Sequence, residues 1–204
     1  MNEYFETRIK TVFPTSKKWE PDVTQFDINN YTERIESVIA ACIKTLPVHA
    51  TCTDCWNQYQ AFAFTSQNAP EFGAWLSMSN SDKIHWIQVN NTPFVVLWVK
   101  VSRVADYYIT FFNHWKPREN TGYLDADCDQ IPSNEWQVYS TTIFDIFNKN
   151  GFSLADAQLL NERVPFVFAW GGDEIPNDDP RWEDDNFEPD PIQATVYDCL
   201  FGDQ

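Results

Sequence analysis

The residues with the clearest chemical character are carboxylates crowded into residues 171–191, here called the acidic segment. It contains nine acidic side chains, a single basic one, Arg181, and four prolines. Carboxylates at this density attract lysine and arginine, so they suit the binding of a basic surface. Because burying so much charge would be prohibitive, we expect an exposed loop held at both ends by flanking strands.

Two aromatic residues of the acidic segment favour a contact surface over a simple solvated loop. Long loops in compact domains commonly carry function, and a loop that only kept the protein in solution would not need apolar side chains. We predict that the aromatic residues act as anchors and that the carboxylates accelerate association. The predicted partner-binding residues are Asp173, Glu174, Asp178, Asp179, Trp182, Glu183, Asp184, Asp185, Phe187 and Glu188.

A second acidic group, Asp125-Ala126-Asp127-Cys128-Asp129, has the alternating carboxylates that begin a calcium-binding loop. The later positions depart from that pattern. Gln130 stands where the sharp turn needs glycine, and Trp136 stands where a bidentate glutamate is needed. We therefore predict an acidic turn that extends the negative surface. The residues for which cation binding stays open are Asp125, Asp127 and Asp129.

A Cys-x-x-Cys pair with a histidine three residues upstream offers three possible zinc ligands: His49, Cys52 and Cys55. A structural zinc site needs four ligands, and the chain has no second Cys-x-x-Cys pair. A redox role would place the motif after a strand, whereas here it follows a predicted helix. We predict packed, reduced thiols, and metal binding by this trio stays open. The odd count of five cysteines also fits a reducing compartment.

The chain offers few candidates for catalysis by histidine, because it has only three histidines: His49, His85 and His114. His85 and His114 fall in predicted strands of one meander and could approach each other. The sequence lacks Gly-x-Ser-x-Gly, His-Glu-x-x-His and P-loop motifs, and its six glycines are few for a phosphate-cradling loop. We predict that the protein is not an enzyme and that it has no catalytic residue, metal or cofactor.

The charge of the chain is distributed unevenly along the sequence. The formal net charge is -16, of which residues 1–117 carry -1 and residues 118–204 carry -15. Such a field repels nucleic acid and anionic membranes and attracts basic proteins. No apolar run reaches the ~20 residues of a bilayer span, and the acidic N-terminus does not resemble a secretory signal. These features predict a cytoplasmic protein that binds neither nucleic acid nor membrane.

The elements that position these residues start from two apolar runs, 94–99 and 107–112, separated by a short polar break. Both are rich in β-branched and aromatic residues, which predicts an antiparallel hairpin at the centre of a sheet. The alternating stretch 83–89 would add a third strand and complete a meander over about residues 83–115. The other predicted strands are 136–139, 166–170 and 194–201.

The clearest predicted helix covers residues 30–46, with Asn30 as its cap, Glu33 completing a capping box and Pro47 as its stop. The other predicted helices are 54–64, 142–149 (stopped by Gly151) and 154–163 (capped by Ser153). Residues 1–30 are predicted to pack as an arm and residues 67–81 to form a loop. We predict one α+β domain over residues 1–204, with a mostly antiparallel sheet and helices packed on one side.

In overall profile the chain resembles immunity proteins of bacterial toxin–immunity systems. The shared features are a small cytosolic α+β domain, abundant aromatic residues, strong acidity and the lack of catalytic or cofactor motifs. The resemblance covers the general profile, and no motif matches residue by residue. It implies that an acidic surface blocks the active cleft of a cationic toxin, often a nuclease.

The leading hypothesis is therefore a binding protein that neutralises a basic protein partner. One alternative is a nucleic-acid mimic that sequesters a DNA-binding protein, which predicts carboxylates spaced along a ridge. Another is a small hydrolase or metal-dependent enzyme, which predicts a pocket containing a histidine or carboxylate with a strongly shifted pKa. The sequence leaves the partner, the oligomeric state and the strand order open.

Overall fold

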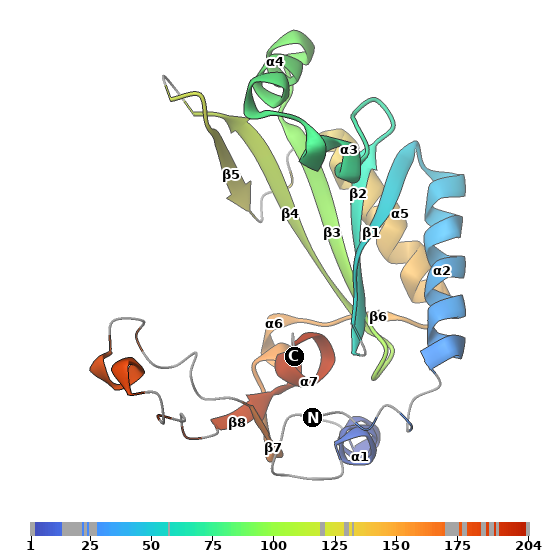
Figure 1. Ribbon diagram of the computed structural model, residues 1–204. Helices are drawn as coiled ribbons and strands as arrows, with labels where there is room; N and C mark the ends of the chain where they lie inside the picture. Colours follow the sequence, from blue (N-terminus) through green and yellow to red (C-terminus); the bar gives the residue numbers. More distant parts are fainter. Residues whose placement is uncertain are drawn as a thin grey trace.

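A computed structural model describes residues 3–13, 22, 24, 28–56, 58–118, 121–128, 131, 133–169, 176, 179–184, 187, 190 and 192–202 (Figure 1). In chain order the elements are α1 (Glu3–Val12), α2 (Ile28–Thr45), β1 (Val48–Cys55), β2 (Tyr59–Ser66), α3 (Phe72–Ser77), α4 (Asn80–Asn90), β3 (Phe94–Ser102), β4 (Tyr107–Pro117), β5 (Leu124–Cys128), α5 (Asn134–Lys149), β6 (Ser153–Leu154), α6 (Ala157–Leu160), β7 (Arg163–Ala169), η3 (Pro180–Glu183), β8 (Ile192–Thr195) and α7 (Val196–Phe201).

The predicted central hairpin is confirmed as β3 and β4. These strands pair antiparallel, with Leu97 opposite Phe112 and Val101 opposite Tyr108. They lie in a six-stranded sheet of order β1-β2-β3-β4-β5, in which β6 adds a short parallel pairing to β4. β7 and β8 form a separate two-stranded sheet. The chain is therefore an α+β domain built on a mostly antiparallel sheet.

Two predicted elements before the hairpin are wrong. Residues 83–89 lie in α4, which begins where the Ser79 hydroxyl accepts a hydrogen bond from the Asp82 backbone N–H. Residues 54–64 span the turn between β1 and β2, so the third strand of the meander is β2. β2 is buried on both faces from Tyr59 to Thr65, and this burial conceals the alternation that marks a strand.

The predicted helix at 30–46 is confirmed as α2, although its start differs. Asn30 lies within the first turn of α2, so it is not the predicted cap. The predicted helix at 142–149 is confirmed as the second half of α5. The predicted strand at 136–139 is wrong, because these residues lie in the first half of the same helix. The Ser133 hydroxyl caps α5 by accepting from the Trp136 backbone N–H. Gly151 follows α5 with φ +83, as expected of a helix stop.

Predictions near the two ends of the chain need further correction. Residues 154–163 form β6 and the short α6, and Asp156, not Ser153, caps α6. Residues 194–201 are strand only at their start, because a capping box between Thr195 and Asp198 begins α7. The predicted arm over residues 1–30 contains α1 instead, and the predicted loop 67–81 contains α3. The arm residues Trp19, Val23 and Phe26 lie outside the described residues.

Helices cover both faces of the large sheet, which corrects the expectation of one side. The long helices α2 and α5 pack on the face that carries Phe64, Leu97 and Val99. The opposite face is covered at one end by α3 and α4 and at the other by α1, α7 and β7–β8 (Figure 1). At the α3–α4 end, the Trp75 ring stacks on the Phe94 ring with centroids 3.8 Å apart. Within the described parts of the chain, no helix has the length and apolar character needed to cross a membrane.

Candidate functional site

The described part of the acidic segment is organised around its single cation, Arg181. The Arg181 guanidinium donates two hydrogen bonds of 2.9 Å to the Asp179 carboxylate, which also accepts from the Arg181 backbone N–H. The guanidinium lies 5.3 Å from the centroid of the Phe187 ring. These hydrogen bonds from Arg181 lower the pKa of Asp179 to about 2. A local turn of the chain, η3, is therefore held by one arginine.

The structure places only some of the predicted contact residues. Glu183 and Asp184 are exposed at the end of η3, as a contact surface requires. Phe187 is half-buried beside Arg181, and its role as an aromatic anchor stays a prediction. η3 extends away from the large sheet, beyond β8 (Figure 1). The predicted contact residues that lie outside the described part of the chain are Asp173, Glu174, Asp178, Asp185, Glu188 and the side chain of Trp182.

The acids of β5 are neutralised by bases from β4 and from the residue that follows it. Asp125 lies 2.6 Å from the Arg118 guanidinium. Asp127 forms an ion pair with Lys116, and one of its carboxylate oxygens lies 3.2 Å from His114 Nε2. The hydrogen bond from Lys116 is the main reason that the pKa of Asp127 is lowered. The prediction that this group extends the negative surface therefore fails for these two residues, while Asp129 lies outside the described part.

The three possible zinc ligands do not come together. His49 pairs with Thr65 across β1 and β2, so it faces away from Cys52, and its Nδ1 lies 3.6 Å from Glu71. Across the described residues, no group of three or more histidine, cysteine or acidic side chains could hold a metal ion.

The expectation of packed thiols holds for Cys42 and Cys199, which are buried and reduced. Burial raises the pKa of Cys42 to about 12. The expectation is wrong for the three exposed cysteines: Cys52, Cys55 and Cys128.

The two histidines expected to share a meander lie on elements of different kinds. His85 is exposed on α4, whereas His114 lies on β4 and its side chain is 11% exposed. The Nδ1 atom of His114 is buried, and no hydrogen-bond partner for it is found among the described atoms. The structure thus replaces the predicted pair of histidines with a pair formed by His114 and Asp127.

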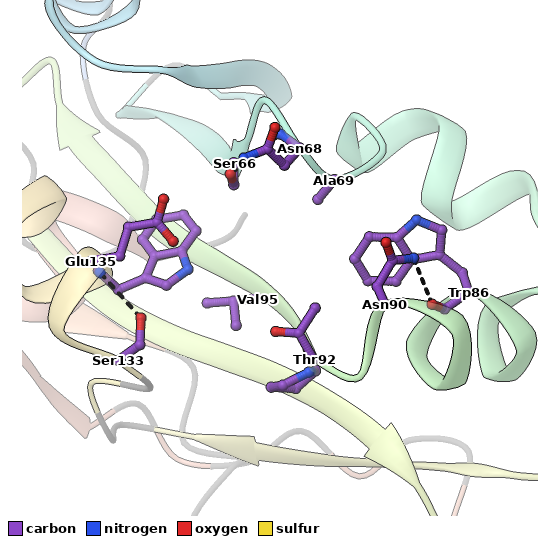
Figure 2. Close-up of a pocket in the computed structure, with 11 residues that line it drawn as sticks. Ser66, Asn68, Ala69, Trp86, Asn90, Thr92, Val95, Ser133 and Glu135 are labelled. Carbon is purple, nitrogen blue, oxygen red and sulfur yellow. Dashed lines mark hydrogen bonds between the residues drawn. The ribbon is translucent and has the colours of Figure 1, made fainter.

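A pocket of about 340 Å³ was not anticipated from the sequence (Figure 2). It lies where the turn after β2, the end of α4 and the start of α5 meet. Trp86 and Trp136 supply aromatic surface, and Glu135 supplies a carboxylate that accepts a hydrogen bond from the Tyr139 hydroxyl. The remaining lining residues are Ser66, Asn68, Ala69, Asn90, Thr92, Pro93, Val95 and Ser133.

The lining of this pocket determines which ligands it suits. Among the described residues that line it, none is a lysine or arginine. Hydroxyl, amide and carboxylate groups beside two indoles suit a small polar ligand. Burial, followed by the hydrogen bond to Glu135, raises the pKa of Tyr139 to about 12. Tyr139 therefore stays protonated at neutral pH and can donate to Glu135.

A second pocket of about 550 Å³ shares Thr92 and Pro93 with the first, and its lining includes His114 and Lys116. The two pockets together draw residues from the end of β2, α4, β3, β4 and the start of α5. Their assembly depends on tertiary packing between segments far apart in sequence. The local signals for this region are the Ser79 cap, which fixes where α4 begins, and the Ser133 cap, which fixes where α5 begins.

Comparison of the chain with known proteins finds no relative. No protein-family model matches the chain, and searches of curated proteins and of solved structures find no match either.

Proposed function

We propose that this chain is an acidic binding protein that neutralises a basic protein partner through the acidic segment. In its specific form, the proposal is an immunity-type inhibitor that blocks a cognate effector. The observation that carries the proposal is the charge balance of the segment. Arg181 is its only base, and that base already binds Asp179. With nine acids against one base, the segment carries a formal charge of -8 whatever pairs form within it, and this charge attracts a cationic surface.

The flanking strands support this proposal because they fix the base of the segment. Ala169 pairs with Ile192 where the segment leaves β7 and enters β8. Val164, Val167 and Ala194 from these strands are buried in the cluster that includes α1 and α7. A segment whose ends are fixed loses less conformational freedom on binding than a free tail, so more of the attraction is available as affinity.

The proposal can be tested by affinity capture from cell extract. The immobilised proteins are the wild type, E183K/D184K and a control, E33K/E36K, which makes the same change in net charge on exposed positions of α2. We expect a basic protein to bind the wild type and the control and to be lost from E183K/D184K. The activity of the captured protein should then fall when the wild type is added in equimolar amount.

Two outcomes would contradict the proposal. If both variants lost the partner equally, binding would depend on net charge and not on the acidic segment. If both variants kept it, the contact surface would lie elsewhere. The nucleic-acid-mimic alternative gains nothing from Asp125 and Asp127, because their charges are already balanced within the domain.

A second candidate function is that of an enzyme acting on a small polar substrate. Its support is the pair of pockets that flank Thr92 and Pro93, with Glu135 lining one and His114 the other. A thermal-shift screen of small polar metabolites against the wild type, E135Q and H114N tests this candidate. A compound that stabilises the wild type and not one of the variants would support it, and a screen without such a compound would count against it.

A further inference from the structure

Cys55 is an exposed residue whose sulfur contacts two hydrogen-bond donors from the protein interior. It lies at the end of β1, and its Sγ is 3.0 Å from Nη2 of Arg103 and 3.7 Å from Nε2 of Gln60. A guanidinium cannot accept a hydrogen bond, so the sulfur is the acceptor of the contact with Arg103. Gln60 is 4% exposed, and its Oε1 is buried without a partner among the described atoms.

Arg103 is an unusual donor because it is a buried cation. It is 5% exposed, and it donates to the Trp56 carbonyl at 2.7 Å and to the Thr32 hydroxyl at 3.1 Å. Within the part of the chain that the structure describes, no carboxylate forms an ion pair with it. A buried charge is normally compensated by an opposite charge. Since arginine keeps its proton, the ionisable group that lies in hydrogen-bond contact with it and can carry negative charge is the Cys55 sulfur.

A β-bulge in β1 brings Cys55 to this position. Residues three apart on a regular strand point to opposite faces of the sheet. Cys52 pairs with Phe62 and Cys55 pairs with Gln60, so the extra residue, Thr53, places both cysteines on one face. For the neighbouring Cys52, burial, followed by the charge of Cys55, raises the pKa of the thiol.

We propose that Cys55 is a nucleophilic cysteine and a modification site for peroxides and alkylating electrophiles, with Arg103 supporting the negative sulfur. With hydrogen peroxide, a sulfur electron pair attacks one oxygen, the S–O bond forms and the O–O bond breaks. The departing hydroxide takes a proton from solvent and becomes water. Cys55 is oxidised to a sulfenic acid and the peroxide is reduced. This inference does not depend on the proposed binding function.

The chain contains its own comparator for this site. Cys128 is also exposed, and its Sγ lies 2.9 Å from Nδ2 of Asn113, which is an uncharged donor. Both cysteines are exposed and both sulfurs accept from a side-chain amide, and the Cys55 sulfur accepts from the Arg103 guanidinium in addition. A difference in their reactivity that is lost in R103Q therefore reports the effect of the guanidinium.

The test is competitive labelling of the folded protein, read by peptide mass spectrometry. A short pulse of iodoacetamide at pH 7 should alkylate Cys55 at least about 10-fold faster than Cys128 and Cys52. Hydrogen peroxide followed by dimedone should place its adduct first on Cys55, and C55S should remove that adduct. Equal or slower labelling of Cys55 relative to Cys128 would overturn the proposal.

Variants at the donor positions separate charge from packing. We expect R103Q to bring the labelling rate of Cys55 close to that of Cys128, and N113A to leave the rate of Cys55 unchanged. Because Arg103 is buried and R103Q could unfold the domain, the wild-type ratio of Cys55 to Cys128 decides the matter without that variant. If a folded R103Q kept the full wild-type ratio, Arg103 would not be the supporting group.

Discussion

The two acidic regions of the molecule, the β5 strand and the acidic segment, differ in how their charge is balanced. In β5, Asp127 lies opposite His114 in the β4–β5 register and also pairs with Lys116. In the acidic segment, nine acids share one arginine, and that arginine is bound to Asp179. The difference shows that a count of acids does not define a binding surface. The net negative charge that a surface presents also depends on the bases that a neighbouring strand places beside its acids.

The largest expected effect concerns the core at the α3–α4 end, against which Leu124 of β5 packs. Trp75 is 2% exposed and stacks on Phe94, so W75A should lower the free energy of unfolding by about 3–5 kcal/mol. Trp56 is 42% exposed, and W56A, a matched loss of an indole, should cost about 0.5 kcal/mol or less. Chemical denaturation measures both values. A cost for W75A as small as that for W56A would contradict the packing described for the α3–α4 end.

The next largest effect is the pH dependence of the turn in the acidic segment. The pKa of Asp179 is lowered to about 2 by Arg181, so the ionised carboxylate stabilises the local turn. That contribution is complete above the pKa of an unfolded aspartate, about 3.9, and is lost as the pH falls towards 2. A carboxyl-carbon NMR titration should find the low midpoint in the wild type and a midpoint near the ordinary value in R181Q. A wild-type midpoint near 3.9 would show that Arg181 does not organise the turn.

The smallest expected effect is on the β5 side. Asp127 and Lys116 are about half exposed, and exposed ion pairs contribute little to stability. D127N should therefore leave the midpoint of chemical denaturation close to that of the wild type and far above that of W75A. A loss comparable to that of W75A would mean that the β4–β5 ion pairs support the fold, beyond neutralising charge.

The sequence predicts the fold class and the central hairpin because strands 94–99 and 107–112 keep their β-branched and aromatic pattern without competing periodicity. It fails where two periods fit the same residues. In 83–89 the apolar residues alternate, but Ile84 and Ile87 also lie three apart, as on one face of a helix, and the Ser79 cap favours the helix α4. In 54–64, the apolar residues have a spacing that is compatible with a helix, but those from Tyr59 onward lie in β2, a strand that is buried on both faces.

The candidate sites could be predicted from the sequence only in part, because some of them join residues that are far apart in the chain. The acidic segment stands out because its residues are consecutive, so composition reveals it. The pockets around Thr92 and Pro93 and the contact between Arg103 and Cys55 join residues far apart in the chain. Sequence spacing carries no information on such contacts. The balance of charge at β5 depends on its pairing with β4, and the sequence left the strand order open.

The most direct test of the central claim neutralises two acids in each region and compares the two variants. E183Q/D184N and D125N/D127N remove the same charge, and calorimetry measures the affinity of each for the basic protein captured by the wild type. We predict that E183Q/D184N weakens binding about 10-fold and that D125N/D127N leaves it unchanged. Equal weakening by both variants, or a loss confined to D125N/D127N, would contradict the assignment of the contact surface to the acidic segment.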